Sequence, residues 1–365
     1  MRAAVLEQFN APLVVRDVEI DAPHGGEVMV RVAAAGICGS DLKAIDGKSP
    51  VTPHLPLIPG HESAGVVEEV GPGVTSVRPG DHVIVAMTGP CGRCGHCRAG
   101  RFARCDGPTR ASIMGLMTDG TTRLTVDGEP ARPFIGVGAF AEYVVVNEQM
   151  VVKIRDDAPL DTASLLACGV ITGVGAVVNS ARVEPGSTVA VVGCGGVGLN
   201  VVQGARLAGA ATIVAVDVVL DKAQLACEFG ATHVVVPENG DLTEAVLAVV
   251  PGGVDYAFDA TGVQGILTSA FNATRDGGTT VMVGSPPSAA PIEIPPQKLF
   301  FSRTLRGCSG GDAVPARDLP MLVDLWMSGR LDVSSLITDR VPLAGVNDAI
   351  ERVRAGKVAR ALVTF

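Results

Sequence analysis

The stretch from 188 to 217 constrains the fold of this chain more than any other. An apolar run, Val189–Val192, reads as a buried strand, the sequence GCGGVG follows at 193–198, and Leu199–Leu207 then has the pattern of a helix. The first glycine allows a tight turn, the second lets backbone N–H groups approach a pyrophosphate, and the third lets the helix pack on the strand. We therefore expect a dinucleotide site with the helix N-terminus facing the anion. The predicted contacts in this turn are Gly193, Gly195, Gly196, Val197 and Gly198.

A second predicted strand, Ile213–Val216, ends in Asp217. A carboxylate at this position can accept hydrogen bonds from a ribose diol and would repel the additional phosphate of NADP, so we expect the cofactor to be NAD. Lys222, on the helix predicted to follow, is a further predicted cofactor contact. The alternative is an ordinary glycine-rich turn, which the sequence of strand, glycines, helix, strand and acid disfavours.

Four of the nine cysteines lie in one polar loop, at Cys91, Cys94, Cys97 and Cys105, with the spacing C-x2-C-x2-C-x7-C. Four thiolates at such spacing are typical of a closed tetrahedral zinc site, which replaces the core that a polar loop cannot build. His96 is a possible competing ligand, although four thiolates already complete the coordination shell. The alternative is a set of unrelated free cysteines.

Composition restricts the class of protein. The chain has 365 residues, 47% of them hydrophobic, which is enough for two domains with separate cores. The net charge of -9 and the lack of a Lys/Arg-rich run argue against nucleic acid or an anionic membrane as partner. The N-terminal sequence MRAAVLEQFN has no apolar signal core and no apolar run is long enough to span a bilayer, so we expect a cytoplasmic protein.

The order of the predicted elements indicates the fold class. Residues 1–35 and the runs 64–70, 81–86 and 140–146 read as strands, whereas strands and helices alternate from 213 to 283. Such alternation is typical of a doubly wound parallel sheet. From about Val314 the chain is predicted to be helical, and it ends in a strand, Ala361–Phe365.

Cys38, the triplet Gly60-His61-Glu62, the four-cysteine loop, Cys168 and GCGGVG occur in an order that resembles the zinc-dependent medium-chain alcohol dehydrogenase family. The resemblance is strongest to the long, liver-type members, close to bacterial NAD-linked or nicotinoprotein enzymes. It implies a GroES-like, β-rich catalytic domain at 1–169 with a structural zinc loop at 90–106, and an inserted Rossmann NAD-binding domain at 170–309. Residues 310–365 would return to the catalytic domain. It also implies a homodimer or homotetramer joined through sheet edges, with 279–283 and 304–308 as candidate strands.

The resemblance also implies an active site. Cys38, His61 and Cys168 would bind a catalytic zinc, the second of two zinc ions per chain, and leave a fourth position open for water or substrate oxygen. An alcohol bound there loses its proton near neutral pH, and hydride then passes to the nicotinamide. Asp41 resembles the acceptor for the second imidazole nitrogen, and Glu62 the acid behind the metal.

Other positions correspond to cofactor, proton-transfer and substrate residues of the family. Ser40 matches the proton-transfer hydroxyl; Thr172 matches a residue near the nicotinamide and Arg360 a pyrophosphate contact. Two departures are Lys43, where many relatives place a histidine, and Gly39, where a cationic side chain often contacts the pyrophosphate. The positions that resemble the substrate wall are Met87, Thr88 and Phe140, although Met87 and Phe140 could equally belong to the core.

The leading interpretation is thus an NAD-dependent zinc alcohol dehydrogenase that acts on primary aliphatic or aromatic alcohols and aldehydes. One alternative is a nicotinoprotein that retains NAD and uses a second acceptor. Another is a thiol-dependent formaldehyde dehydrogenase, which carries an arginine four residues after the last loop cysteine, where this chain has Thr109 followed by Arg110. A hypothesis from a different class is a non-catalytic scaffold that binds zinc and nucleotide.

Overall fold

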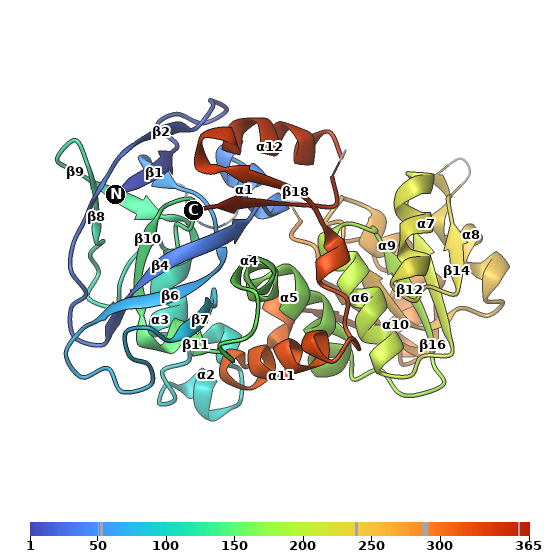
Figure 1. The fold of residues 1–365 in the computed structure, drawn as a ribbon. Coiled ribbons are helices and arrows are strands. Elements are labelled where there is room, and N and C mark those ends of the chain that lie inside the picture. The colour runs from blue at the N-terminus through green and yellow to red at the C-terminus, as the bar shows by residue number, and fades with distance from the viewer. Residues whose placement is uncertain (50, 52–53, 238–239, 287–290, 357) are drawn as a thin grey trace. The chain divides into compact units, whose positions relative to one another are not determined.

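The computed structural model describes residues 1–49, 51, 54–237, 240–286, 291–356 and 358–365. These residues form two compact units (Figure 1). The first unit combines Met1–Gly169 with Val314–Phe365, and the second is Val170–Ala313. The chain therefore leaves the first unit once and returns to it for its last segment.

The first unit is built on β-structure. Its seven-stranded sheet has the order β11 (Val151–Lys153), β7 (His82–Val85), β6 (Glu62–Val70), β4 (Glu27–Gly36), β19 (Arg360–Thr364) and β18 (Ile337–Pro342), and β10 (Tyr143–Asn147) also pairs with β4. A four-stranded sheet has the order β3 (Glu19–Ile20), β8 (Leu124–Val126), β9 (Glu129–Pro133) and β5 (Leu57–Ile58), and β1 (Arg2–Val5) pairs with β2 (Val14–Asp17). The last strand, β19, is thus built into the sheet next to β4, which comes from the start of the chain.

Alternation along β4 fixes which face of this sheet is buried. Val28, Val30 and Val32 point into the main core cluster, which also contains Phe134 and Phe140, because side chains two residues apart lie on the same face of a strand. Strand β4 ends at Gly36, and a short helix, α1 (Gly39–Ile45), begins three residues later.

Helices complete the first unit. The others described in it are α2 (Gly95–Arg98), α3 (Pro108–Ile113), α4 (Leu160–Ala163), α11 (Pro315–Met327) and α12 (Val346–Arg354). The prediction of helices after Val314 is confirmed, and α11 begins at Pro315, because proline in the first turn of a helix loses no hydrogen bond through its missing N–H. Neither α1 nor α3 was expected, since both are short and contain Gly, Ser or Pro.

The second unit is a six-stranded sheet with the order β14 (His233–Val235), β13 (Thr212–Val216), β12 (Thr188–Val192), β15 (Val254–Asp259), β16 (Thr274–Met282) and β17 (Thr304–Gly307). All of its pairings are parallel. Numbered along the chain, this is the order 3-2-1-4-5-6 of a doubly wound dinucleotide-binding sheet. The predicted α/β class, a Rossmann sheet inserted into a GroES-like β-rich domain, is confirmed.

Helices connect the parallel strands of the second unit (Figure 1). They are α6 (Gly196–Leu207), α7 (Leu220–Glu228), α8 (Leu242–Val249), α9 (Ile266–Ala273) and the short α10 (Pro296–Phe300). Alternate residues of β12 and β13, such as Ala190 and Val214, pack with Leu242 of α8 and Ala270 of α9 in one buried cluster. Both faces of the sheet must be covered in this way, because right-handed crossovers place helices on both sides.

Three predicted elements differ from the structure. Helix α6 begins at Gly196 rather than at 199, because the glycine turn itself supplies the first helical residues. Strand β10 begins at Tyr143, not at 140. The candidate edge strand 279–283 was wrong, since it forms part of β16, which lies between β15 and β17; of the two candidates only the segment 304–308, which contains β17, lies at an edge.

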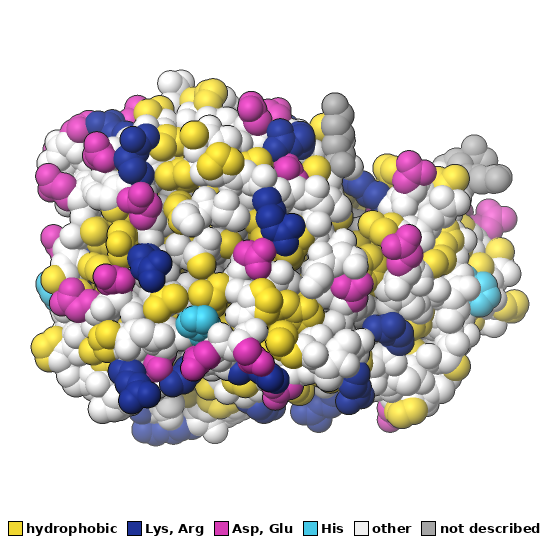
Figure 2. Space-filling model, viewed as in Figure 1, with side chains coloured by type: hydrophobic (Ala, Val, Ile, Leu, Met, Phe, Trp, Pro, Cys, Tyr) yellow, Lys and Arg dark blue, Asp and Glu magenta, His cyan; other side chains and the backbone are white. Residues whose placement is uncertain are grey.

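Surface and helix composition add two observations. In the described chain no single helix is both long and apolar enough to cross a membrane; only the bent pair Leu160–Ala167 and Gly169–Ala181 meets the length and composition criteria, when the two are taken together. Figure 2 shows basic and acidic side chains interspersed over the visible face. The net charge of -9 is therefore not gathered into one acidic patch on that face.

Candidate active site and metal centres

Three separate segments of the first unit place Cys38, His61 and Cys168 together. Cys38 precedes α1, His61 immediately precedes β6, and Cys168 follows the 3-10 helix 164–167. Their ligand atoms and one carboxylate oxygen of Glu62 all lie within 4.8 Å of one another. All four residues are at most 8% exposed. The predicted ligand set therefore forms one buried cluster, with Glu62 as a fourth member.

Asp41 holds the two halves of this cluster together. Its Oδ2 accepts the backbone N–H of Cys38 at 2.9 Å, and its Oδ1 accepts the N–H of Gly60 at 3.0 Å. The same Oδ1 lies 3.0 Å from Nδ1 of His61. A buried carboxylate at Nδ1 keeps the proton on that nitrogen, which leaves Nε2 as the free ligand atom. This is the contact that the sequence led us to expect of Asp41.

The chemistry of the cluster fits a divalent cation. Burial lowers the pKa of His61, but the charge and hydrogen bond of Asp41 and the neighbouring Cys38 outweigh burial and raise it to about 10. The hydrogen bond with Cys168 and the proximity of His61 hold the pKa of Cys38 well below its usual value, against the effect of burial. Both Glu62 oxygens are buried. Thiolates gathered away from water require a compensating cation, and Zn²⁺ binds thiolate and imidazole donors.

Glu62 is also paired with Arg360. The guanidinium Nη2 and a Glu62 oxygen form an ion pair in which both side chains are buried. Gly36 makes room for it, because a Cβ there would lie 2.2 Å from Glu62 Oε2. The predicted contact of Arg360 with the pyrophosphate stays a prediction, since in this structure its guanidinium is used by Glu62.

Ser40 lies beside the ligand atoms of the cluster. Its Oγ donates to Cys38 Sγ at 3.2 Å and lies 3.1 Å from His61 Nε2. The hydroxyl therefore stands beside the ligand atoms, within reach of a group bound there. Lys43 lies on the last turn of α1 and is half-buried.

The four-cysteine loop forms a second cluster. The Sγ atoms of Cys91, Cys94, Cys97 and Cys105 lie within 4.8 Å of one another. Backbone amides point at the sulfurs, as in Cys91 N to Cys105 Sγ at 3.2 Å and Cys94 N to Cys91 Sγ at 3.4 Å. Amides of Arg93 and Cys94 lower the pKa of Cys91 to about 6, whereas burial raises that of Cys97 to about 12. Sulfur-only donors with amide support fit a structural Zn²⁺ site, and His96 is not part of the set.

The glycine turn of the second unit fits a bound pyrophosphate. Gly193 has φ +91°, and a Cβ on Gly198 would lie 1.7 Å from the Gly193 carbonyl oxygen, so both positions need glycine. A Cβ on Gly195, by contrast, would meet nothing within 4 Å. Gly195 caps α6 without any side-chain hydrogen bond, and the turn therefore presents unobstructed N–H groups from Gly196 and Val197 to an anion.

Asp217 lies at the end of β13, as expected. Its Oδ2 accepts the N–H of Cys194 at 2.8 Å and its Oδ1 accepts the N–H of Val219 at 2.9 Å. These bonds fix the carboxylate beside the glycine turn. Lys222 is half-buried, and Thr172 is 8% exposed.

The predicted substrate-wall residues differ in exposure. Met87 and Thr88 are half-buried, whereas Phe140 has no exposed surface and packs in the main core cluster. Gly60, with φ +90°, fits against the Phe140 ring, since a Cβ there would lie 2.6 Å from Cδ1. These observations favour the alternative interpretation for Phe140, as a core residue beneath the site.

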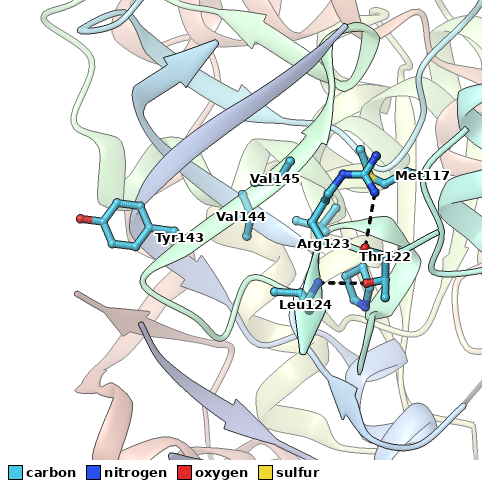
Figure 3. Close-up of a pocket in the computed structure, with 9 residues that line it drawn as sticks. Met117, Thr122, Arg123, Leu124, Tyr143, Val144 and Val145 are labelled. Carbon is cyan, nitrogen blue, oxygen red and sulfur yellow. Dashed lines mark hydrogen bonds between the residues drawn. The ribbon is translucent and has the colours of Figure 1, made fainter. Parts of the chain in front are cut away.

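The cavity in Figure 3 belongs to a different part of the first unit. Its volume is about 10 Å³, room for about one water molecule. Arg123, on its wall, is 4% exposed and pairs with Glu27 and Asp119, each at 2.6 Å. Because the buried guanidinium is already neutralised, we assign this cavity a structural role.

One neighbour of the metal cluster was missed from the sequence. Phe134 stands edge-on to the His61 ring, with centroids 5.5 Å apart and planes at 84°. It lies in an irregular turn far from the motifs, so no spacing pattern indicates it. The Arg360 pairing with Glu62 was missed for the same reason.

Comparisons with known proteins agree with this site. Residues 24–156 match the family described as alcohol dehydrogenase GroES-like domain, and residues 196–327 match zinc-binding dehydrogenase. The S-(hydroxymethyl)glutathione dehydrogenase of Paracoccus denitrificans is 41% identical over 100% of this chain and 99% of its own length.

Solved structures give the same result. An alcohol dehydrogenase zinc-binding domain protein from Burkholderia ambifaria superimposes with a TM-score of 0.94 at 38% identity, covering 100% of this chain and 98% of that one. The benzyl alcohol dehydrogenase of Acinetobacter calcoaceticus gives 0.93 at 32% identity, covering 100% and 99%. With both metal clusters and the glycine turn in place, this chain belongs to the zinc-dependent medium-chain alcohol dehydrogenase family.

Proposed function

We propose that this enzyme transfers hydride between a primary alcohol and NAD at the cluster of Cys38, His61 and Cys168. The observation that carries the proposal is the buried position of Asp41, which fixes His61 with Nε2 free for a metal. Such a ligand set with its supporting acceptor has no use in a scaffold protein. When bound, zinc acts as a Lewis acid toward the substrate oxygen and NAD accepts the hydride.

The residues around the ligands each have a proposed role. The Cys38 and Cys168 thiolates would balance the charge of the cation, and Asp41 would hold the imidazole in one tautomer. Glu62, buried against Arg360, would supply a carboxylate behind the metal. The Arg360 guanidinium would keep that carboxylate ionised in a site that excludes water.

Ser40 is the residue proposed to take the alcohol proton. Its hydroxyl lies 3.1 Å from His61 Nε2, which is within hydrogen-bonding distance of a proposed metal-ligand atom. The chain has Lys43 where many relatives have a histidine, so we propose that the proton passes from Ser40 to the cofactor ribose or to water.

We assign NAD to the second unit. Gly193, Gly195 and Gly198 would receive the pyrophosphate and Asp217 the adenosine ribose, with Thr172 and Lys222 as further contacts. We propose residues 170–309 as the NAD-binding domain, and residues 1–169 with 310–365 as the catalytic domain. The carboxylate of Asp217 supports NAD over NADP, because it would repel a phosphate on the ribose.

The substrate is proposed to be an apolar primary alcohol, aliphatic or aromatic. Met87 and Thr88 are partly exposed and supply a mixed apolar wall, and Phe140 would support it from the core. The similarity to a benzyl alcohol dehydrogenase supports an aromatic substrate.

A second candidate is thiol-dependent formaldehyde oxidation, since one relative is an S-(hydroxymethyl)glutathione dehydrogenase. Against it, Thr109 occupies the position of the expected arginine and is 1% exposed, so it cannot meet an anionic thiol adduct. Arg110 is exposed and is the remaining cation there.

We also propose a homodimer formed through β17. This strand is a sheet edge, and the neighbouring Phe300 and Phe301 are 82% and 51% exposed. An unpaired edge beside exposed aromatic rings is a site where a second copy can extend the sheet. Light scattering after size exclusion distinguishes a dimer from a monomer or tetramer. A cytoplasmic location is proposed because none of the nine cysteines, all of which lie in the described residues, forms a disulfide.

The test is NADH absorbance when purified enzyme meets excess NAD and benzyl alcohol. Continuous growth over many turnovers supports an exchanging NAD-dependent dehydrogenase. Growth that stops at one equivalent, with turnover of the alcohol restored by an aldehyde or dye acceptor, would indicate a nicotinoprotein. Turnover only with glutathione and formaldehyde would replace the proposal by the second candidate.

A further inference from the structure

The helix that follows the structural cysteine loop is hydrogen-bonded to two segments that carry residues of the candidate site. Helix α3, Pro108–Ile113, begins three residues after Cys105, and two of its hydroxyl side chains, Thr109 and Ser112, are each 1% exposed. Buried hydroxyls have partners, and the partners here are backbone groups of other segments. Those segments carry Met87 and Phe134.

Thr109 is bonded to both backbone groups of Gly89. Its Oγ1 accepts the Gly89 N–H at 3.1 Å and donates to the Gly89 carbonyl at 3.3 Å. Gly89 directly follows Met87 and Thr88, the two half-buried positions of the proposed substrate wall. The hydroxyl of Thr109 therefore fixes the end of that wall.

Ser112 connects the same helix to two further carbonyls. Its Oγ lies 2.5 Å from the Ile135 oxygen and 3.1 Å from the Met87 oxygen. Ile135 has φ +48° and ψ 39°, a left-handed conformation that β-branched residues rarely adopt. Such strain persists only where surrounding contacts hold it. Gly136 closes the contact, since a Cβ there would lie 2.6 Å from Ser112 Cα.

The strained turn carries Phe134, which is 1% exposed and packs edge-on against His61. A continuous set of contacts thus runs from the cysteine loop through α3 to the substrate wall on one side and to the metal-binding imidazole on the other. Each link is a buried hydrogen bond or ring contact within the first unit.

We propose that Thr109 and Ser112 are positioning residues, through which the structural cysteine loop sets substrate fit and the orientation of His61. The inference rests on the proposed function and goes beyond it, because it assigns a role in specificity to a loop that otherwise only stabilises the fold. Thr109 acts on the wall at Met87 and Thr88, and Ser112 acts on both the wall and Phe134.

The first test separates the hydroxyl of Thr109 from its methyl group. Thr109→Val removes the hydroxyl and keeps the shape, and we expect KM for benzyl alcohol to rise about 5- to 10-fold, as for a displaced apolar contact. We expect kcat to change less than about 2-fold, because the loss is one of substrate binding. Thr109→Ser keeps the hydroxyl and should restore the parental KM. The matched control is Thr162→Val, a buried threonine whose hydroxyl bonds to Asp161.

The second test reads the metal directly. With Co²⁺ in the catalytic site, Ser112→Ala should shift the cobalt d–d absorption, because the turn that holds Phe134 against His61 loses its support. Thr162→Val should leave the spectrum unchanged. This readout requires no turnover, and it remains informative if Thr109→Val does not fold.

The outcomes distinguish a failure of the proposed function from a failure of the positioning role of Thr109 and Ser112. A parent enzyme that oxidises neither benzyl alcohol nor other alcohols overturns the proposed function, while the cobalt spectrum still tests the positioning of His61. An active parent with unchanged KM in Thr109→Val and an unchanged cobalt spectrum in Ser112→Ala overturns the inference alone. Equal losses in Thr162→Val would mean that the effects come from general destabilisation, which also overturns it.

Discussion

Replacing Asp41 by asparagine is the sharpest test of the catalytic cluster. The carboxylate has two oxygens and accepts three donors, the N–H groups of Cys38 and Gly60 and Nδ1 of His61, at 2.9 to 3.0 Å. Asparagine offers one oxygen and one NH2 group, so at least one donor must face another donor. Leaving one buried N–H without an acceptor costs about 1 to 3 kcal/mol. We expect Asp41→Asn to lower the free energy of unfolding by about this amount.

The same substitution should weaken zinc binding. If the amide turns its NH2 group toward His61, that group donates to Nδ1, and the imidazole proton moves to Nε2, the ligand atom. Loss of such a supporting acceptor lowers metal affinity by about 10- to 100-fold, which corresponds to about 1.4 to 2.7 kcal/mol.

The assay is zinc content per chain after dialysis against buffers of decreasing free zinc, with chemical denaturation in parallel. The variant should lose one zinc, from the Cys38 site, before the parent does, and should retain the second in the cysteine loop as an internal reference. Asp157→Asn, at a carboxylate that is 61% exposed, is the matched control. Parental zinc affinity and parental kcat in Asp41→Asn would refute the assignment of Asp41 and the tautomer argument.

Three further predictions concern other sites. Gly195→Ala should unfold near the parental temperature yet bind NADH at least about 10-fold more weakly, because its methyl group enters open space at the anion site. Its matched control is Gly198→Ala, whose Cβ would lie 1.7 Å from the Gly193 carbonyl oxygen and which should instead lower the melting temperature. The hydrogen bond from Lys153 at 2.6 Å lowers the pKa of Asp81, so Asp81 stabilises the fold above its unfolded pKa and loses that effect as pH falls through the folded value. Asp81→Asn should therefore destabilise more at pH 7 than at pH 3 in urea titrations, and an equal loss at both pH values would contradict this linkage. Cys94→Ser should remove one zinc and lower the melting temperature, while unchanged heat stability would count against a structural zinc.

Short-range patterns in the sequence predicted the dinucleotide turn and the cysteine loop. In both, the functional groups lie within about 30 residues of each other, and their spacing is itself the geometry. Even there the helix start was wrong by three positions, since Gly196, a poor helix former, is the first residue of α6. The space for a pyrophosphate at Gly195 exists because no atom of the described chain, apart from this glycine and its two neighbours in sequence, lies within 4 Å of where a Cβ would be. The local sequence does not show this.

Contacts between distant segments could not be derived from the residues alone. Cys38, His61 and Cys168 were identified as a set only through the family resemblance, because their meeting depends on how β4, β6 and the segment before Cys168 pack. Strand order is equally non-local, and this is why 279–283 was wrongly expected at a sheet edge. The ion pair of Glu62 and Arg360 joins β6 to β19, the last strand of the chain. No pattern within either segment predicts it.

Glycines around the active site show why such contacts escape a sequence pattern. Gly36 is the last residue of strand β4 and has no positive φ; its need for glycine comes from the Glu62 carboxylate, 2.2 Å from where a Cβ would be. Gly60 needs both a positive φ and the space beside Phe140. A turn glycine can be recognised from its neighbours in the chain, whereas these two are required by side chains that arrive from elsewhere. Any larger residue at Gly36 would displace Glu62 from Arg360 or open β4 from β6, so this buried ion pair depends on a residue without a side chain.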